Sequence, residues 1–152
     1  MGGISIWYWL IIILPIPLAF IIKQPSGPNR FGPAPDRVSF TSAVYLGFSK
    51  SFDFSARASR SEYWFFWLFQ FLLFFVAEVV LIFLPDFRVF VFLLNIGLLV
   101  PMLALTVRRL HDGNRSGWWQ LLYLTGVGGI TLFIWMLQRP KDDLATQEPI
   151  QL

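Results

Sequence analysis

Long apolar runs separated by short polar stretches dominate the chain. Four such runs occupy residues 4–22, 63–84, 89–107 and 118–137. Each is long enough to cross ~30 Å of hydrocarbon as a helix that rises ~1.5 Å per residue. We therefore predict an all-α integral membrane protein with four transmembrane helices. A cleaved signal peptide is the alternative for the first run, but residues 1–3 carry no side-chain charge and Leu18-Ala19-Phe20 is a poor cleavage site.

The stretch between the first two runs divides into a linker and a short helix. Residues 23–38 are rich in proline and glycine, which favours irregular structure. In residues 39–52, apolar side chains recur at helical spacing, which predicts a short amphipathic helix in the membrane interface. An ordinary loop with scattered aromatics is the alternative. We expect an N-terminal helix and linker at 1–38, a membrane domain at 39–140 and a polar tail at 141–152.

Local signals place the helix ends and one bend. Ser59 and Glu62 have the spacing of a capping box, so the second helix should begin near Ser59. Pro85 and Asp86 mark a tight turn before the third helix. Pro101 should kink that helix, because proline leaves the carbonyl of Gly97 without its helical donor. Residues 108–117 then read as a polar loop.

Composition supports the membrane prediction and excludes several classes of function. Hydrophobic residues are 56 % and charged residues 14 %, whereas soluble proteins average about 25 % charged. The chain has no cysteine and one histidine, which excludes disulfides, thiolate chemistry and a multi-histidine metal site. We expect no metal and no cofactor. A net charge of +3 is too small to indicate nucleic acid, so membrane lipids are the expected partners.

The distribution of lysine and arginine predicts the orientation. Basic residues concentrate in the first and third loops, whereas the second loop holds only Arg88 and the tail only Arg139 and Lys141. Basic loops stay in the cytoplasm under the positive-inside rule. Four spans with those loops inside would place both termini on the outer side of the membrane.

Two polar motifs carry the candidate chemistry. In the first, Arg57 and Arg60 would share a face of a helical turn and grip one phosphate. The second joins the third and fourth spans, and its Asp112 could pair with an arginine of either motif or fix the ring of His111. The candidates for binding an anionic group are Arg57, Arg60, Arg108, Arg109, His111 and Arg115. The alternative is that these charges orient the chain, snorkel and tie the two loops together.

Neither motif predicts catalysis. His111 and Asp112 supply at most half of a catalytic triad, and no serine is placed as a nucleophile, so we expect no enzyme activity. Structural turn positions are Asp112, Gly113, Asn114 and Gly117, among which Gly113 and Asn114 tolerate left-handed backbone.

Glu78 stands alone as an acid inside an apolar run. A carboxylate there costs on the order of 2.5–3.5 kcal/mol on insertion scales. By residue count, Asn95 and Thr131 fall in the same half of the bilayer, whereas Gln70 falls in the other half. An intramembrane polar layer of Glu78, Asn95 and Thr131 would form a proton or cation site. The alternative is a neutral glutamic acid that ties helices together.

Both polar motifs resemble those of the bacterial inner-membrane family known as domain of unknown function 805, the YhaH-like proteins. The matching residues are Phe54, Arg57, Ala58, Arg60, Glu62, Tyr63 and Trp64, then Arg108 to Asp112 and Arg115 to Trp119. The resemblance covers about residues 39–140 and implies a helical inner-membrane protein without an established activity. Ala56 replaces the family's glycine. A copy of the family's C-terminal tail, at residues 28–33, follows the first span here, in conflict with the predicted orientation.

Three functions remain open at this point. The first is a structural or interaction module that assembles as a homo-oligomer or with another membrane protein. The second is a proton- or ion-coupled transporter or channel subunit centred on Glu78. The third is an anionic-lipid-binding protein that uses the cytoplasmic arginines and His111.

Overall fold

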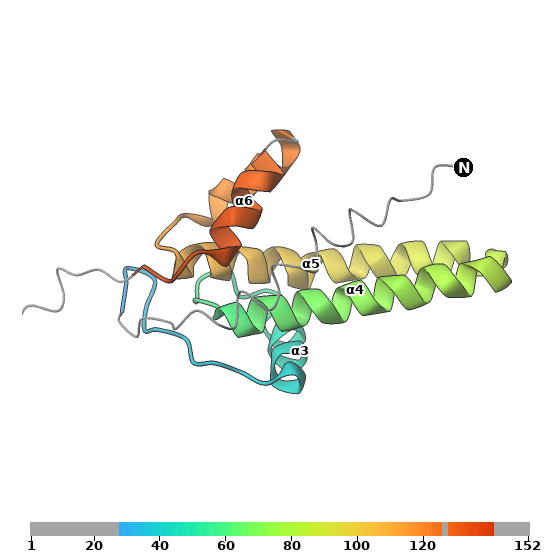
Figure 1. Cartoon of the computed structure of the whole chain (residues 1–152), viewed down its shortest axis with the longest axis horizontal. Coiled ribbons are helices and arrows are strands. Elements are labelled where there is room, and N and C mark those ends of the chain that lie inside the picture. The colour runs from blue at the N-terminus through green and yellow to red at the C-terminus, as the bar shows by residue number, and fades with distance from the viewer. Residues whose placement is uncertain (1–27, 126–127, 142–152) are drawn as a thin grey trace, which may run out of the picture.

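The computed structural model describes residues 28–125 and 128–141, so the first predicted span lies outside the described residues. Two long helices, α4 (Arg60–Phe83) and α5 (Arg88–Asp112), run side by side in opposite directions (Figure 1). The short 3-10 helix η1 (Pro85–Phe87) joins them. The other described elements gather at the end where α4 begins and α5 ends.

The second predicted span is present as α4, and its start is set by the predicted cap. Ser59 is the N-cap residue, and its hydroxyl accepts a hydrogen bond from the backbone N–H of Glu62 at 3.1 Å. This bond satisfies one of the donors that a helix start leaves without an intrahelical partner. The helix has 24 residues, or ~36 Å at ~1.5 Å per residue. It therefore exceeds the thickness of the hydrocarbon core.

The third predicted span is present as α5, but it is longer than expected. Pro101 lies inside it, as predicted, and the helix continues through Arg108 to Asp112, where a loop was expected. The last turn stays helical because its polar side chains are buried against other segments, which a local polarity pattern does not reveal. Both α4 and the η1–α5 segment are long and apolar enough to cross a membrane.

The fourth predicted span is not confirmed, because no single described helix covers it. Residues 118–137 form two short helices, the 3-10 helix η2 (Gly117–Thr125) and α6 (Gly128–Leu137), which pack against each other. At ~2.0 Å per residue for η2 and ~1.5 Å for α6, their lengths are ~18 Å and ~15 Å, so neither crosses ~30 Å of hydrocarbon. A Cβ at Gly128 would overlap the carbonyl oxygen of Leu122, so this close packing requires glycine.

The η2–α6 hairpin brings the chain back to the end from which it left. Arg115, just before η2, donates to the side-chain oxygen of Gln138, just after α6, at 2.8 Å. In Figure 1 the hairpin projects obliquely from the α4–α5 pair. The described C-terminal segment therefore lies beside the basic loops, whereas four complete spans would place it at the opposite end.

The short helix predicted after the linker is α3 (Phe40–Ser49), which packs across the first half of α4. Its buried residues are the small Ala43 and Gly47, and Gly47 lies so close to Phe66 that a Cβ would overlap the ring. Its aromatics Tyr45 and Phe48 remain exposed. Helical spacing thus predicted the helix, whereas the packed face is formed by its small residues.

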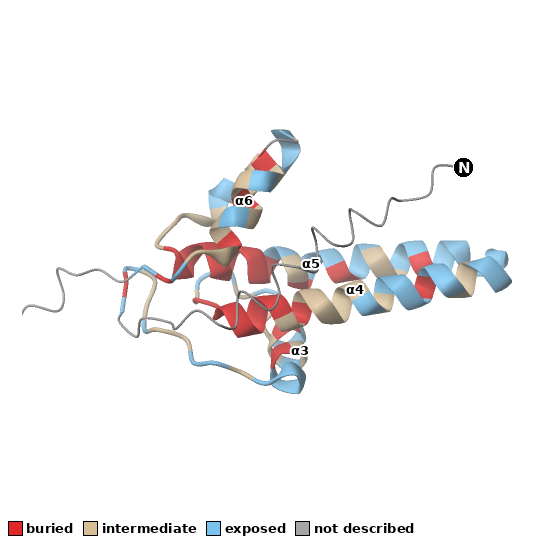
Figure 2. Ribbon diagram, viewed as in Figure 1, coloured by how far each residue is buried: buried red, intermediate tan, exposed pale blue. Residues whose placement is uncertain are grey.

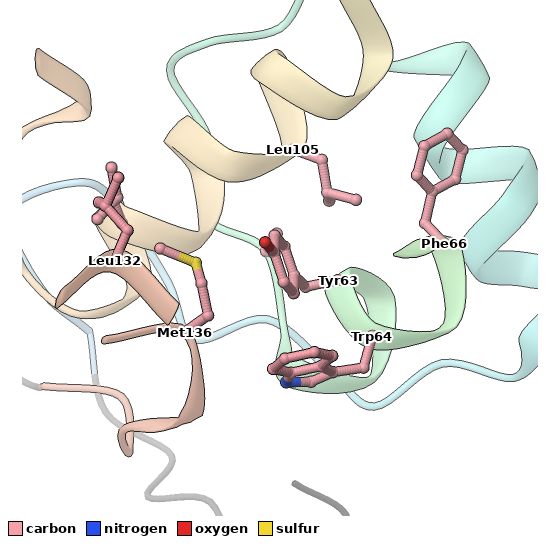
Figure 3. Close-up of a cluster of buried hydrophobic side chains, with 8 residues drawn as sticks. Tyr63, Trp64, Phe66, Leu105, Leu132 and Met136 are labelled. Atoms are coloured by element: carbon pink, nitrogen blue, oxygen red, sulfur yellow. The ribbon is translucent and has the colours of Figure 1, made fainter. Parts of the chain in front are cut away.

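The hydrophobic core occupies only the inner half of the helix pair. Tyr63 and Trp64 of α4 lie toward Leu132 and Met136 of α6, whereas Phe66 lies on the other side of Leu105, against α3 (Figure 3). Beyond this cluster most α4 and α5 residues are exposed, including Phe75, Ile82 and many other large apolar side chains (Figure 2). An exposed apolar surface of this extent is expected where hydrocarbon surrounds the helices.

Candidate functional site

The two polar motifs lie together at the end of the α4–α5 pair where α4 begins and α5 ends, which we call the inner end. The backbone N–H of Ala58, in the loop before α4, donates to the carbonyl oxygen of Arg108 in α5 at 3.0 Å. The Nδ1 atom of His111 lies 3.3 Å from the carbonyl oxygen of Ser55 and 3.2 Å from that of Ala56. The loop and the last turn of α5 therefore form one unit.

A local turn holds this loop in shape. One carboxylate oxygen of Asp53 accepts from the backbone N–H of Ser55 at 3.0 Å, from the Ser55 hydroxyl at 2.8 Å and from the backbone N–H of Ala56 at 3.2 Å. Partial burial raises the pKa of Asp53, but these hydrogen bonds outweigh it and hold the pKa below its ordinary value. Asp53 thereby positions the two carbonyl groups that face His111.

Asp112 is the centre of the buried charge cluster. Its carboxylate accepts from Nε and Nη2 of Arg57 at 3.1 and 2.8 Å, and it also pairs with Nη1 of Arg109. All three side chains are at most 1 % exposed. One carboxylate therefore joins an arginine from each motif, as the tying alternative predicts. The ring of His111 is fixed by carbonyl groups and not by Asp112.

A second buried ion pair stands beside the first. Nη1 of Arg108 donates to a carboxylate oxygen of Glu62 at 2.8 Å, and Arg108 is 0 % exposed. Nε and Nη2 of Arg108 have no hydrogen-bond partner within the described part of the chain. This pair joins the first turn of α4 to the last turn of α5, but it uses the guanidinium group far less completely than the Arg57–Asp112 pair does.

Arg109 also closes the end of the η2–α6 hairpin. Its Nη2 donates to the carbonyl oxygens of Met136 and Gln138 at 3.1 and 2.6 Å, and its Nε donates to Met136 at 3.2 Å. The backbone N–H of Lys141 then donates to the carbonyl oxygen of Asp112 at 3.0 Å. The carbonyl groups at the C-terminal ends of α5 and α6 thus accept hydrogen bonds from donors that their own helices do not supply.

A tight turn from residues 29–32 docks on the same cluster. Asn29 donates through its amide to the carbonyl oxygens of His111 and Lys141 at 2.9 and 3.1 Å. Phe31 stacks on the His111 ring with 3.9 Å between centroids and 2° between planes. Gly32 accepts from Nη1 of Arg57 at 3.0 Å. This docking removes the conflict over the displaced tail motif, because residues 28–33 and the segment after α6 lie at the same end.

The predicted anion-binding residues gather at one end, but their donors are largely engaged. Arg57 precedes α4, so it does not share a helical face with Arg60, the first residue of that helix. Arg60 is 1 % exposed. Arg115 donates to Gln138 and lies over the ring of Trp135, 4.3 Å from the centroid, and burial lowers its pKa. These charged side chains bind one another and do not form an open site for phosphate. We call the buried ion pairs of Arg57 and Arg109 with Asp112 and of Arg108 with Glu62 the clasp.

No hydrogen bond of the described residues joins Glu78, Asn95 and Thr131 to one another. Asn95 donates to the carbonyl oxygen of Val91 in its own helix at 2.8 Å, and it lines a pocket of about 280 Å³ with Gln70. Gln70 was expected in the opposite half of the bilayer. Thr131 lies on α6, in which the Phe133 ring is 5.7 Å from the Trp64 ring. Glu78 follows Trp64 by ~21 Å along α4 at ~1.5 Å per residue.

Only one of the four predicted turn residues adopts the left-handed conformation. Asn114 adopts the left-handed conformation with φ 55°, whereas Gly113 has φ −83°. Asp112 belongs to α5 and Gly117 begins η2. Ala56, which replaces the family's glycine, is not among the described residues with positive φ.

Among the described residues, no arrangement of side chains supports catalysis or metal binding. Asp112 pairs with arginines while Nδ1 of His111 faces carbonyl groups, so an aspartate–histidine–serine relay is not formed. No group of three or more histidine, aspartate or glutamate side chains gathers there in a way that could hold a metal ion. Sequence reasoning missed the roles of Asn29, Phe31 and Gln138. The copied tail motif was the one available signal for the first two.

Two long apolar helices, an exposed apolar outer half and a charged inner end together define the class: a helical membrane protein with a buried ion-pair clasp. The family model described as a protein of unknown function (DUF805) matches residues 51–145, and the chain belongs to this family.

The curated relatives agree with this class. The inner membrane protein YhaI of Escherichia coli (strain K12) is 36 % identical over 93 residues, which cover 59 % of this chain and 79 % of the relative. The inner membrane protein YhaH of the same strain is 36 % identical over 86 residues, which cover 53 % and 71 %. No solved structure matches the chain. The protein is therefore a bacterial inner-membrane protein of a family without a known function.

Proposed function

We propose that the chain is a non-enzymatic interaction module, in which the buried clasp holds the α4–α5 pair rigid and the outer half of that pair binds a second copy of the chain. The observation that carries this proposal is Glu78. It is exposed on α4 and makes no hydrogen bond or ion pair with the residues that the structure describes. An acid that faces hydrocarbon alone is unfavourable by on the order of 2.5–3.5 kcal/mol, so a partner is expected.

A second copy suits this acid for a chemical reason. A neutral carboxylic acid carries one donor and one acceptor, so two of them related by a two-fold axis satisfy each other. The surrounding surface is apolar and includes Phe75, 54 % exposed, and Ile82, 75 % exposed. Both lie within about a quarter turn of Glu78 on a helix that turns 100° per residue. The contact would therefore combine one polar pair with apolar packing.

The other two functions have less support. Asn95 bonds to its own helix and Thr131 lies on α6, so neither supports an ion site at Glu78. The guanidinium groups of Arg57 and Arg109 are bound by Asp112 and by carbonyl oxygens, which leaves fewer donors for a lipid phosphate. The geometry therefore favours assembly over transport or anionic-lipid binding.

The orientation belongs to the same proposal. All described lysines and arginines except Arg88 belong to segments at the clasp end, so the positive-inside rule puts the clasp in the cytoplasm. The segment after α6 would then be cytoplasmic, in contrast to the periplasmic C-terminus expected for four spans. Single cysteines at Asp86 and Arg139 would report this. We expect an impermeant thiol reagent to label Asp86→Cys in intact cells, and Arg139→Cys only after the membrane is opened.

Crosslinking tests the assembly, because the natural chain has no cysteine. Ile82→Cys places a thiol on the Glu78 face, and Val76→Cys places one on the other side of the same helix, where Val76 is 56 % exposed. We expect oxidation in native membranes to give a dimer band for Ile82→Cys and a much weaker one for Val76→Cys. Adding Glu78→Gln should preserve the band, since an amide still pairs, whereas adding Glu78→Leu should weaken it.

Three outcomes would contradict this function. Equal crosslinking at both positions would indicate random collision. A monomer for both variants would remove the second copy as the partner. A proton flux in liposomes that disappears in Glu78→Gln would favour the transporter.

A further inference from the structure

A pocket of about 310 Å³ lies beside the clasp, between the loop before α4, the last turns of α5 and the start of η2. Its apolar walls include Phe54, Val107, Trp118 and Leu121, and its polar groups are His111, Ser116 and Gln120. None of the interactions of the clasp itself requires this space. The pocket therefore needs an explanation of its own.

The hydrogen bonds of His111 decide what its ring offers to this pocket. Nδ1 lies against the carbonyl oxygens of Ser55 and Ala56, which only accept, so Nδ1 must carry the hydrogen. In the neutral ring Nε2 is then an acceptor. No described residue donates a hydrogen bond to it. Phe31 covers one face of the ring and holds its plane. The tautomer and the plane of the ring are thus both set from outside the pocket.

Gln120 supplies a second acceptor. Its side-chain oxygen is buried and has no hydrogen-bond partner among the described residues. A buried acceptor without a donor is unfavourable, so the Gln120 amide gains a hydrogen bond if it turns toward a donor in the pocket. Ser116 adds a hydroxyl, which accepts a long contact of 3.5 Å from the backbone N–H of Trp118 and can still donate.

The chemistry of these groups selects the ligand. A phosphate oxygen has no hydrogen to donate, so it could bind only the Ser116 hydroxyl and the Gln120 amide N–H and would leave both acceptors without a donor. A cation is disfavoured because no carboxylate is among the described residues that line the pocket. A neutral hydroxyl group remains, since it donates to an acceptor and also accepts from Ser116.

The position of the pocket indicates what carries the hydroxyl. Trp118 is 79 % exposed and Leu121 is 52 % exposed, and both belong to the apolar hairpin. Tryptophan prefers the boundary between headgroups and hydrocarbon. The pocket therefore has both apolar and polar lining residues, which fits an amphipathic molecule.

We propose that this pocket binds the hydroxyl-bearing headgroup of an amphipathic molecule, with hydroxyl groups donating to Nε2 of His111 and to the side-chain oxygen of Gln120. A glycerol headgroup of a membrane lipid and a free polyol share this chemistry. The site does not depend on assembly through Glu78, so either proposal can fail alone.

The single histidine makes the test direct, because the full chain labelled with ¹⁵N-histidine gives one imidazole. The protein is placed in nanodiscs of phosphatidylcholine alone, or with added phosphatidylglycerol, phosphatidic acid or phosphatidylethanolamine. A fifth sample adds free glycerol to phosphatidylcholine discs. We expect hydrogen on Nδ1 in every sample, and a shift of the Nε2 resonance with phosphatidylglycerol that grows with its fraction.

Each outcome decides for or against the site. A Nε2 shift with phosphatidylglycerol alone identifies a lipid headgroup, and an equal shift with free glycerol identifies a soluble polyol as sufficient. An equal shift with phosphatidic acid means that charge, not hydroxyl, is recognised and overturns the proposal. So does a shift with phosphatidylethanolamine alone, no shift in any sample, or hydrogen on Nε2 in phosphatidylcholine.

A matched pair of variants locates the response. Gln120→Leu removes the second acceptor at similar volume, and we expect it to abolish most of the phosphatidylglycerol response. Gln70→Leu makes the same change in the other pocket, where the amide donates to the carbonyl oxygen of Leu98 at 3.2 Å. That variant should keep the response. If Gln120→Leu does not fold, the lipid series on the unaltered chain still decides.

Discussion

Replacing Asp112 with asparagine removes the negative charge that two buried guanidinium groups share. Arg57 and Arg109 both pair with this carboxylate, and all three side chains are at most 1 % exposed. The substitution preserves shape and one acceptor oxygen, so its effect reports the charge. It leaves two buried cations without an anion between them.

The magnitude follows from burial. Removing one partner of a buried ion pair typically costs about 3–5 kcal/mol, because the remaining charge is neither solvated nor paired. We take the lower end, about 3 kcal/mol, since asparagine still accepts one hydrogen bond. In a chain of this size, 1 kcal/mol corresponds to ~2–4 °C in melting temperature. Asp112→Asn should therefore lower the apparent melting temperature by ~6–12 °C.

Thermal unfolding of the purified protein, followed by its helical circular dichroism in one fixed detergent, measures this effect. Asp36→Asn is the matched control, because the same chemical change falls on an exposed residue and should alter stability by less than about 0.5 kcal/mol. The double variant Arg57→Met with Asp112→Asn removes one of the stranded cations. It should therefore cost less than the sum of the two single changes.

Two results would refute this reasoning. If Asp112→Asn and Asp36→Asn had the same small effect, the carboxylate would not be the centre of the clasp. If the two single changes added up in the double variant, Arg57 and Asp112 would not be coupled.

Three further comparisons test the site and the fold. Arg57→Lys should lower the melting temperature more than Arg108→Lys, because Arg57 uses three guanidinium nitrogens whereas Arg108 uses one; the reverse order would contradict the hydrogen-bond assignment. Gly32→Ala should cost about 1–3 kcal/mol through its φ of 120°, whereas Gly97→Ala, in open space within α5, should be neutral or slightly stabilising; equal losses would indicate steric clashes. Asp53 has a lowered pKa, so its contribution to stability is present above its unfolded pKa, about 4, and is lost as pH falls through the lower folded value. The stability of Asp53→Asn, measured by unfolding between pH 6 and pH 3, should therefore lack the pH dependence that Asp53 contributes. A pH profile identical to that of the unaltered chain would contradict this reasoning.

Local patterns predicted the elements that depend on neighbouring residues. The serine hydroxyl and glutamate N–H that begin α4 are three residues apart, so their spacing alone identified the cap. Pro101 was expected inside the third span and lies inside α5. The family resemblance was carried by two compact motifs and is confirmed by the match over residues 51–145.

Contacts between distant residues could not be read in this way. The amide of Asn29 meets the carbonyl of Lys141 across 112 positions, and nothing near Asn29 in sequence indicates that partner. The polar run from Arg108 to Asp112 was expected to be a loop because its polarity is visible and its ion-pair partners are not. Apolarity likewise predicted a fourth span, since hydropathy does not distinguish one crossing from two short helices that fold back.

Sequence by itself indicated the solvent, because several apolar runs of this length in a short chain are expected to face hydrocarbon. It also determined where two long helices begin and that the family is one of the inner membrane. Tertiary structure alone decided that the arginines pair internally, that the last apolar run returns to the clasp end, and that Asn95 bonds to its own helix. The physical reason is that hydropathy and caps act within a few residues, whereas a buried charge is stable only beside its partner, wherever in the chain that partner lies.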